Sequence, residues 1–186
     1  SHTLFVIWIG GNDYLPGVTD VDGMTTEVVN EIKGTIDSLI GHGAVNFLVM
    51  NLPDLSKLPY SRIYNMQDVL GVATLVHNSK LEEALAQLRD QYPQVNLQEL
   101  DVNSRFSDLI MHPETYNEQY HLTISETSAS CWQGGYTLAQ PKPAQLQTRD
   151  QILQDLLAHV AAQPKRLTNA YTQTDSLKAE GFASAV

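Results

Sequence analysis

The fold is decided by a stretch near the start of the chain, LFVIWIGGNDY at residues 4–14. Its first six residues are apolar and rich in β-branched and aromatic types, and the run then stops at two glycines. Such a run is typical of a buried strand in a parallel sheet. Because ligands of open α/β sheets bind beyond the carboxyl ends of the strands, Asn12 falls where a ligand is expected.

Asn12 has two interpretations at this point. A carboxamide can donate an N–H to the oxyanion that forms when an ester or amide is attacked. The run Gly-Gly-Asn-Asp is also good turn chemistry, so the same residues fit an ordinary turn after a strand. The local residues alone favour the turn, with Asp13 stabilising the loop by hydrogen bonding.

The rest of the chain predicts further elements of a parallel sheet. In chain order the pattern predicts a loop at 16–23, a helix ended by the glycines at 41 and 43, a strand at 44–51, a helix at 63–90, a strand at 95–100 and a polar substrate-side loop at 113–135. Thr25 or Thr26 is the expected cap of the first helix. A strand, a helix and a second strand in this order form the βαβ unit of a parallel sheet.

Length and composition restrict the function. A chain of 186 residues can form one domain with a real core. Its net charge of −10 argues against binding to nucleic acid, which requires basic surfaces. No apolar run reaches the length of a membrane span, and no signal peptide is visible. Cys131 is the single cysteine, so no intrachain disulfide can form, and we expect it to be an inert, half-buried thiol.

The domain boundary is predicted from a proline pair. Residues 1–140 are expected to form part of an α/β domain. Pro141-Lys142-Pro143 marks its end, and residues 141–186 are expected to carry an amphipathic helix at 148–162 followed by a mobile tail.

The motif after the first strand resembles a known family. Residues 8–14, WIGGNDY, are similar to the G-x-N-D block of the SGNH/GDSL hydrolases, in the bacterial branch of lipases, lysophospholipases and acyltransferases. Two further stretches match in order: VMNLPDLSKLP at residues 49–59, and residues 78–116, which resemble that family's long helix, next strand and following helix. The resemblance covers residues 3–136.

This resemblance implies a fold and a mechanism. The fold is a three-layer αβα arrangement with a mainly parallel, flavodoxin-like sheet, incomplete in this chain. The implied reaction opens lipid acyl esters through a Ser-His-Asp acyl-enzyme mechanism, with Asn12 in the oxyanion hole and Gly10 in the motif loop. Tyr14 and Leu15 either line an acyl pocket or pack in the ordinary way. No cofactor or metal is implied, and the location is secreted or periplasmic in a bacterium.

The nucleophile and the base of that mechanism are not found in the sequence. The tripeptide Asp37-Ser38-Leu39 lies inside a predicted helix, and residues 174–177, TDSL, lack both the glycine and the strand that precede the family's serine. The pairs Asp108/His112 and Asp155/His159 are four residues apart rather than three, a spacing typical of surface pairs. Of the remaining histidines, His42, His77 and His121 are interpreted as structural, and His2 stands next to the first residue of the given sequence.

We therefore expect the serine and the histidine to come from a second polypeptide segment. Two alternatives remain open: a non-catalytic α/β binding domain, and an SGNH esterase that acts on acylated carbohydrate. Of the two tryptophans, Trp8 is expected in the core, and Trp132 in a loop that could touch lipid.

Overall fold

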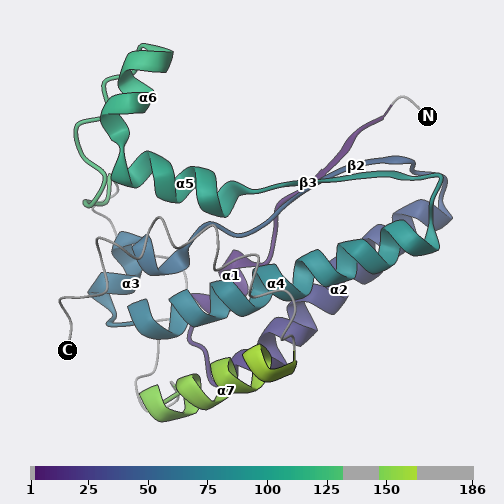
Figure 1. The fold of residues 1–186 in the computed structure, drawn as a ribbon, viewed down its shortest axis with the longest axis horizontal. Coiled ribbons are helices and arrows are strands. Elements are labelled where there is room, and N and C mark those ends of the chain that lie inside the picture. Colours follow the sequence, from purple (N-terminus) through teal and green to yellow (C-terminus); the bar gives the residue numbers. More distant parts are fainter. Residues whose placement is uncertain (1–2, 132–146, 163–186) are drawn as a thin grey trace.

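The computed structural model describes residues 3–131 and 147–162. Its elements are β1 (Phe5–Ile7), α1 (Gly11–Tyr14), α2 (Val21–Gly41), β2 (Asn46–Met50), a short 3-10 helix η1 (Leu55–Lys57), α3 (Pro59–Ile63), α4 (Gln67–Gln91), β3 (Asn96–Leu100), α5 (Val102–Met111), α6 (Pro113–Tyr120) and α7 (Arg149–Ala162) (Figure 1).

The three strands form one parallel sheet in the order β1-β2-β3. In register, Phe5 lies beside Phe47, which lies beside Leu97. Parallel neighbours need a crossover, and α2 and α4 supply the two crossovers. The α/β class predicted from the sequence is confirmed, and the three predicted strands are those that form the sheet.

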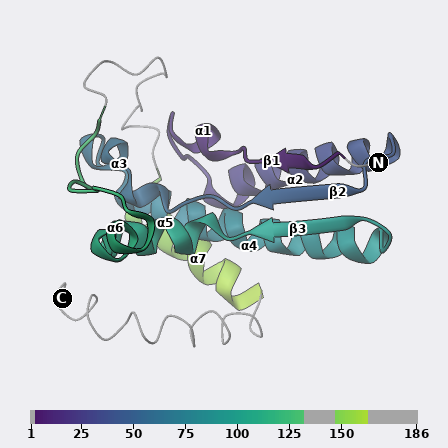
Figure 2. The same ribbon diagram turned by 90° about the horizontal axis from the view of Figure 1, so that it is seen from above.

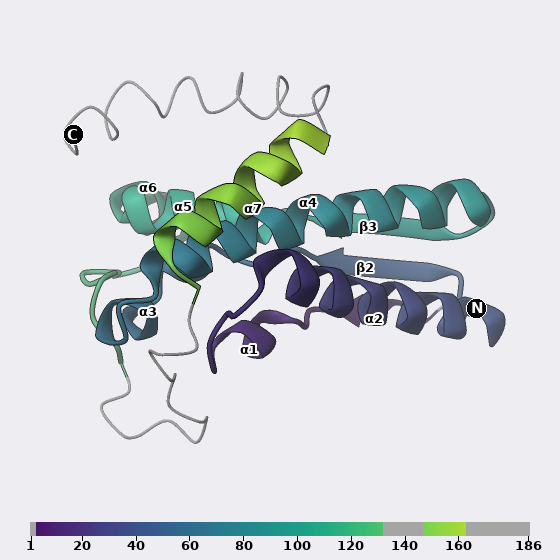
Figure 3. The ribbon, with the colours of Figure 1, turned by 90° about the horizontal axis from the view of Figure 1, so that it is seen from below.

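Helices α2 and α4 cover one face of the sheet, and α7 lies across them (Figure 3). On the covered face Phe47 and Val49 are buried. On the opposite face Val6 is 55% exposed, and Figure 2 shows that no described helix covers the strands there. The described residues therefore contain the sheet and one helical layer of the fold.

Two clusters of buried side chains hold these layers together. The first joins the sheet to α2 and α4 around Phe47, Ile36 and Leu85. The second lies beyond the carboxyl ends of the strands and contains Tyr14 and Leu70. The second cluster packs against the loop that carries Asn12, since a Cβ on Gly11 would meet Leu52 and Leu55 of this cluster.

Several local predictions were wrong. Helix α2 begins earlier than expected: Asp20 caps it by accepting the Gly23 N–H at 2.9 Å. Thr25, the predicted cap, instead donates to the Val21 carbonyl at 2.7 Å within the first turn. Residues 113–120 form α6 rather than a loop. A proline at its first position fits this helix, since that residue needs no backbone hydrogen bond there.

Exposure gives three further corrections. Trp8 is 55% exposed rather than in the core. Cys131 is an exposed thiol rather than a half-buried one. In α7, which confirms the predicted helix, Ile152 is buried whereas Leu153 and Leu157 point outward.

Among the described residues, no helix combines the length and the apolar character needed to cross a bilayer. The sequence at 174–177, the loop with Trp132 and the proline pair at 141–143 lie outside the described residues.

Candidate active site

The loop after β1 forms a tight turn that ends in α1. Gly10 has φ 105°, a left-handed conformation that favours glycine. The Asp13 N–H donates to the Gly10 carbonyl at 3.2 Å and closes the turn. Asn12 lies between them, exposed, at the carboxyl end of β1. Asn12 therefore lies beyond the carboxyl end of a strand, as the sequence predicts.

Gly10 is required by space as well as by φ. A Cβ atom at this position would come within 3.1 Å of His77 Cε1 and 3.1 Å of Val28 Cγ1. The motif loop thus lies directly against α4 on one side and α2 on the other. Such close packing fixes the backbone from which Asn12 projects.

Tyr14 anchors the far end of the same turn. Its hydroxyl lies 2.8 Å from His77 Nδ1, and both side chains are 0% exposed. The rings meet edge to face with centroids 5.7 Å apart. The sequence allowed two interpretations of Tyr14, as part of an acyl pocket or as a packed side chain. In the structure Tyr14 is buried in the core.

Burial keeps this pair neutral. Burial, with a smaller effect of Lys80, lowers the pKa of His77 from 6.5 to about 4. Burial, with a smaller effect of Asp13, raises the pKa of Tyr14 well above its ordinary value. His77 Nε2 has no hydrogen-bond partner among residues 3–131 and 147–162. On a positively charged ring, the Nε2 N–H would therefore be buried without an acceptor.

The ends of β2 and β3 are joined by amides at the same edge of the sheet. Asn51, just after β2, donates to Asp101 at 2.9 Å and accepts the Asn103 N–H at 2.9 Å. Asp101, just after β3, also caps α5 by accepting the Ser104 N–H at 3.0 Å. These bonds fix the loops beside Asn12 to one another.

Asn78 extends this network from α4. Its side chain accepts the Leu52 N–H and donates to the Leu52 carbonyl, both at 2.9 Å. Leu52 in turn lies below the motif loop, since a Cβ on Gly11 would stand 3.6 Å from Leu52 Cδ2. Backbone groups that would otherwise be buried without partners are satisfied in this way.

A cavity of about 310 Å³ opens beside the motif loop. It is lined by residues of the loop and of α2, namely Ile9, Gly10, Asp13, Met24, Glu27, Val28, Glu31 and Ile32. It adjoins the free edge of β1, which pairs with β2 alone among the described strands.

Comparison with known proteins now decides the family. The family model described as GDSL-like lipase/acylhydrolase matches residues 1–135. The chain belongs to this GDSL family. By its description, this family is one of lipases and acylhydrolases.

Relatives of the GDSL chain include enzymes that act on lipids. It is 24% identical over 133 residues to a phosphatidylcholine-sterol acyltransferase of Aeromonas hydrophila, a match that covers 72% of this chain and 37% of that protein. It is 28% identical over 151 residues to a GDSL esterase/lipase of Arabidopsis thaliana, covering 73% of this chain and 38% of that protein. A secreted effector protein of Salmonella typhimurium, SseJ, is 33% identical over 95 residues, which are 50% of this chain and 22% of that protein. The chain thus spans less than two fifths of the length of these relatives.

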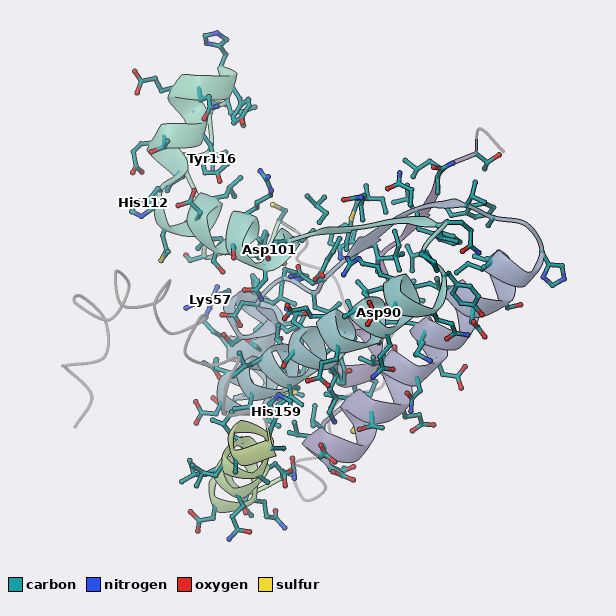
Figure 4. All side chains as sticks on the ribbon, turned by 45° about the vertical axis from the view of Figure 1, so that its right-hand side comes forward. Lys57, Asp90, Asp101, His112, Tyr116 and His159 are labelled. Carbon is teal, nitrogen blue, oxygen red and sulfur yellow. The ribbon has the colours of Figure 1, made fainter. Side chains whose placement is uncertain are left out.

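The structure does not bring the rejected nucleophile and base candidates to this site. Ser38 lies within α2, where its carbonyl accepts two bonds from His42. His112 lies far along the α5–α6 arm, 3.6 Å from Glu114 (Figure 4).

His159, on α7, is also far from Asp101 and the strand ends (Figure 4). It does not pair with Asp155 as the sequence suggested. Asp155 instead accepts from Gln147 at 2.7 Å.

Sequence reasoning missed two features of the site. The first is the Tyr14–His77 hydrogen bond, whose partners are far apart in sequence. The second is the amide network of Asn51 and Asn78. A signal for the network was present, because each apolar strand stops at a polar residue, Asn51 after β2 and Asp101 after β3. As for metals, no cluster of three or more potential ligands occurs among the described residues.

Proposed function

We propose that the natural protein carrying this chain opens lipid acyl esters by an acyl-enzyme mechanism in which Asn12 donates to the oxyanion. The observation that carries the proposal is the exposed Asn12 carboxamide at the carboxyl end of β1, on a turn fixed by Gly10. The GDSL family and a relative that is a phosphatidylcholine-sterol acyltransferase support a lipid ester as the substrate.

In this mechanism a serine hydroxyl attacks the ester carbonyl and gives its proton to a histidine. The carbonyl oxygen becomes negative, and the Asn12 N–H stabilises it. The alcohol leaves with the proton from the histidine, and water or a second alcohol then takes the acyl group from the serine. The first acceptor gives hydrolysis, the second acyl transfer.

We propose that the serine and the histidine reach this site from a second polypeptide segment. Within the described residues, the unpaired edge and the uncovered face of β1 support this, because four apolar side chains in and next to this strand are more than half exposed: Leu4, Val6, Trp8 and Ile9. An unpaired strand edge with apolar neighbours is a template for a further strand. A strand paired in parallel with β1 would end beside Asn12 and would also cover the cavity along α2.

The test is Asn12→Ala in the natural protein, assayed with p-nitrophenyl acyl esters. Loss of one oxyanion donor lowers kcat by roughly a hundredfold to a thousandfold, so we expect a drop of that size with KM little changed. Asn30→Ala is the matched control, since Asn30 is an exposed amide on α2 outside the cavity lining. Turnover that Asn12→Ala leaves intact removes Asn12 from the mechanism.

A fluorophosphonate probe tests the origin of the nucleophile. We expect the label on a serine outside the 186 residues of this chain. A label on Ser38 or on any other serine of this chain would contradict the proposal.

A further inference from the structure

The Tyr14–His77 hydrogen bond is unusual because an apolar pair would fill the same space. Both side chains are fully buried in a cluster of otherwise mainly apolar residues. Whichever ring nitrogen carries the proton, Nε2 stays unpaired among the described residues. A buried polar atom without a partner costs about 1–3 kcal/mol. His77 is therefore a costly residue here unless its hydrogen bond has another use.

The location of His77 shows that use. It contacts both ends of the turn that carries Asn12. At one end its Cε1 lies against Gly10, where an added Cβ would come within 3.1 Å of it and would force one of the two to shift. At the other end its Nδ1 bonds to the Tyr14 hydroxyl at 2.8 Å. Asn12 is two residues from each of these contacts.

A single side chain that contacts positions 10 and 14 restricts the turn between them. Without the hydrogen bond the Tyr14 ring would still be buried, but its position along α4 would depend on dispersion contacts alone, which have little directionality. The hydrogen bond adds a preferred distance and angle. The geometry of an oxyanion donor matters because a shift of about 1 Å in a catalytic group can reduce the rate on the order of a hundredfold.

We propose that His77 is a positioning residue for Asn12. It packs against Gly10 and forms a hydrogen bond with Tyr14, and these two contacts fix the orientation of the Asn12 carboxamide at the carboxyl end of β1. This inference rests on the proposed function of Asn12. It adds a residue of α4, 65 positions after Asn12, to the machinery of the oxyanion hole.

The experiment is a double-mutant cycle of Tyr14→Phe and His77→Phe in the natural protein, with kcat, KM and the free energy of unfolding measured for each variant. Each single change leaves one buried polar group unpaired, so each destabilises the protein. The double change removes both groups and should recover most of the stability. If His77 positions Asn12, kcat of the double variant stays lower by roughly tenfold or more, with KM little changed.

Two results overturn the proposal. One is a double variant that recovers kcat together with stability, because the hydrogen bond would then serve stability alone. The other is a folded Tyr14→Phe variant with the kcat of the parent. This second result can be obtained even if the double variant fails to fold. Leu88→Ala is the control for general destabilisation: Leu88 is buried in α4 far from the turn, and this variant should lose stability and keep kcat.

A second readout does not depend on activity. The side-chain amide signal of Asn12 in an NMR spectrum, assigned by its loss in Asn12→Ala, should be single and sharp in the parent. It should broaden or split in the double variant, and an unchanged signal contradicts the proposal. A parent without esterase activity would contradict the proposed function instead, while the NMR result would still show whether His77 orders the turn.

Discussion

Acid should weaken this protein through His77, and the effect can be calculated. In the folded protein the pKa of His77 is about 4, lowered from its ordinary value of 6.5 first by burial and then by Lys80. In the unfolded chain the same ring is free to take its proton near pH 6.5. Between these two values the unfolded state binds more protons than the folded state. Stability therefore falls as pH decreases through this interval, and it is fully retained above it.

The size of the loss follows from the shift. One pKa unit corresponds to about 1.4 kcal/mol, so the whole interval is worth about 3 kcal/mol. Between pH 7 and pH 4.5 most of this is lost, about 2 kcal/mol. This is a large part of the roughly 5–15 kcal/mol that stabilises an ordinary domain.

The assay is urea unfolding of the parent and of His77→Phe at both pH values. Carboxylates also titrate over this interval, and the comparison removes their contribution because they are common to both proteins. We expect the parent to lose about 2 kcal/mol more than His77→Phe does. Leu88→Ala, which is destabilised without loss of the histidine, should keep the pH dependence of the parent. Equal losses in the parent and in His77→Phe would refute the reasoning, since His77 would then not be buried and neutral.

Three further changes test the packing around the site by the same unfolding measurement. Gly10→Ala should destabilise the protein by on the order of 2 kcal/mol, because alanine is strained at φ 105° and its Cβ would meet His77 and Val28 at 3.1 Å. Gly34→Ala is the control: its Cβ would point into open space on α2, and this change should stabilise the protein by about 0.5–1 kcal/mol. Asn51→Ala should cost about 1–3 kcal/mol, since it removes the buried amide that bridges the ends of β2 and β3, and a cost below about 0.5 kcal/mol would contradict that role. Ile152→Ala should cost about 2–5 kcal/mol and open α7 to proteolysis, while Leu157→Ala, 58% exposed, should do neither.

The sheet was predictable from the sequence because its signal is local. The apolar runs that form β2 and β3 each stop at a polar residue. Between β1 and β2, the apolar residues of α2 recur at helical spacing, so they lie on one face of the helix. The place of Asn12 followed from the same pattern, since a strand end in a parallel sheet is a definite location. These features depend only on residues that are close together in the chain, so a single sequence is enough to predict them.

Exposure along β1 was not predictable in this way. Trp8 and Ile9 have the composition of core residues, and the run alone does not say whether one or both faces of the strand are covered. In the structure Phe5 and Ile7 lie on the covered face, and no helix within residues 3–131 or 147–162 covers the other face of the strand. Whether an apolar residue of a strand is buried depends on what packs against the sheet, and that information lies in elements far from the strand.

The Tyr14–His77 pair is the extreme case of this dependence. His77 lies among the apolar positions of α4, at the spacing of Leu70, Ala73 and Leu81, so the pattern predicts only that it faces the core. Its partner is 63 residues earlier, and nothing in the local sequence of either residue indicates the other. What could be inferred from sequence is weaker but useful: a histidine on a buried helix face must find a hydrogen-bond partner or lower its pKa. Here it does both, and the partner it finds is the residue that ends the turn of Asn12, which is why a side chain of the core bears on the chemistry at the surface.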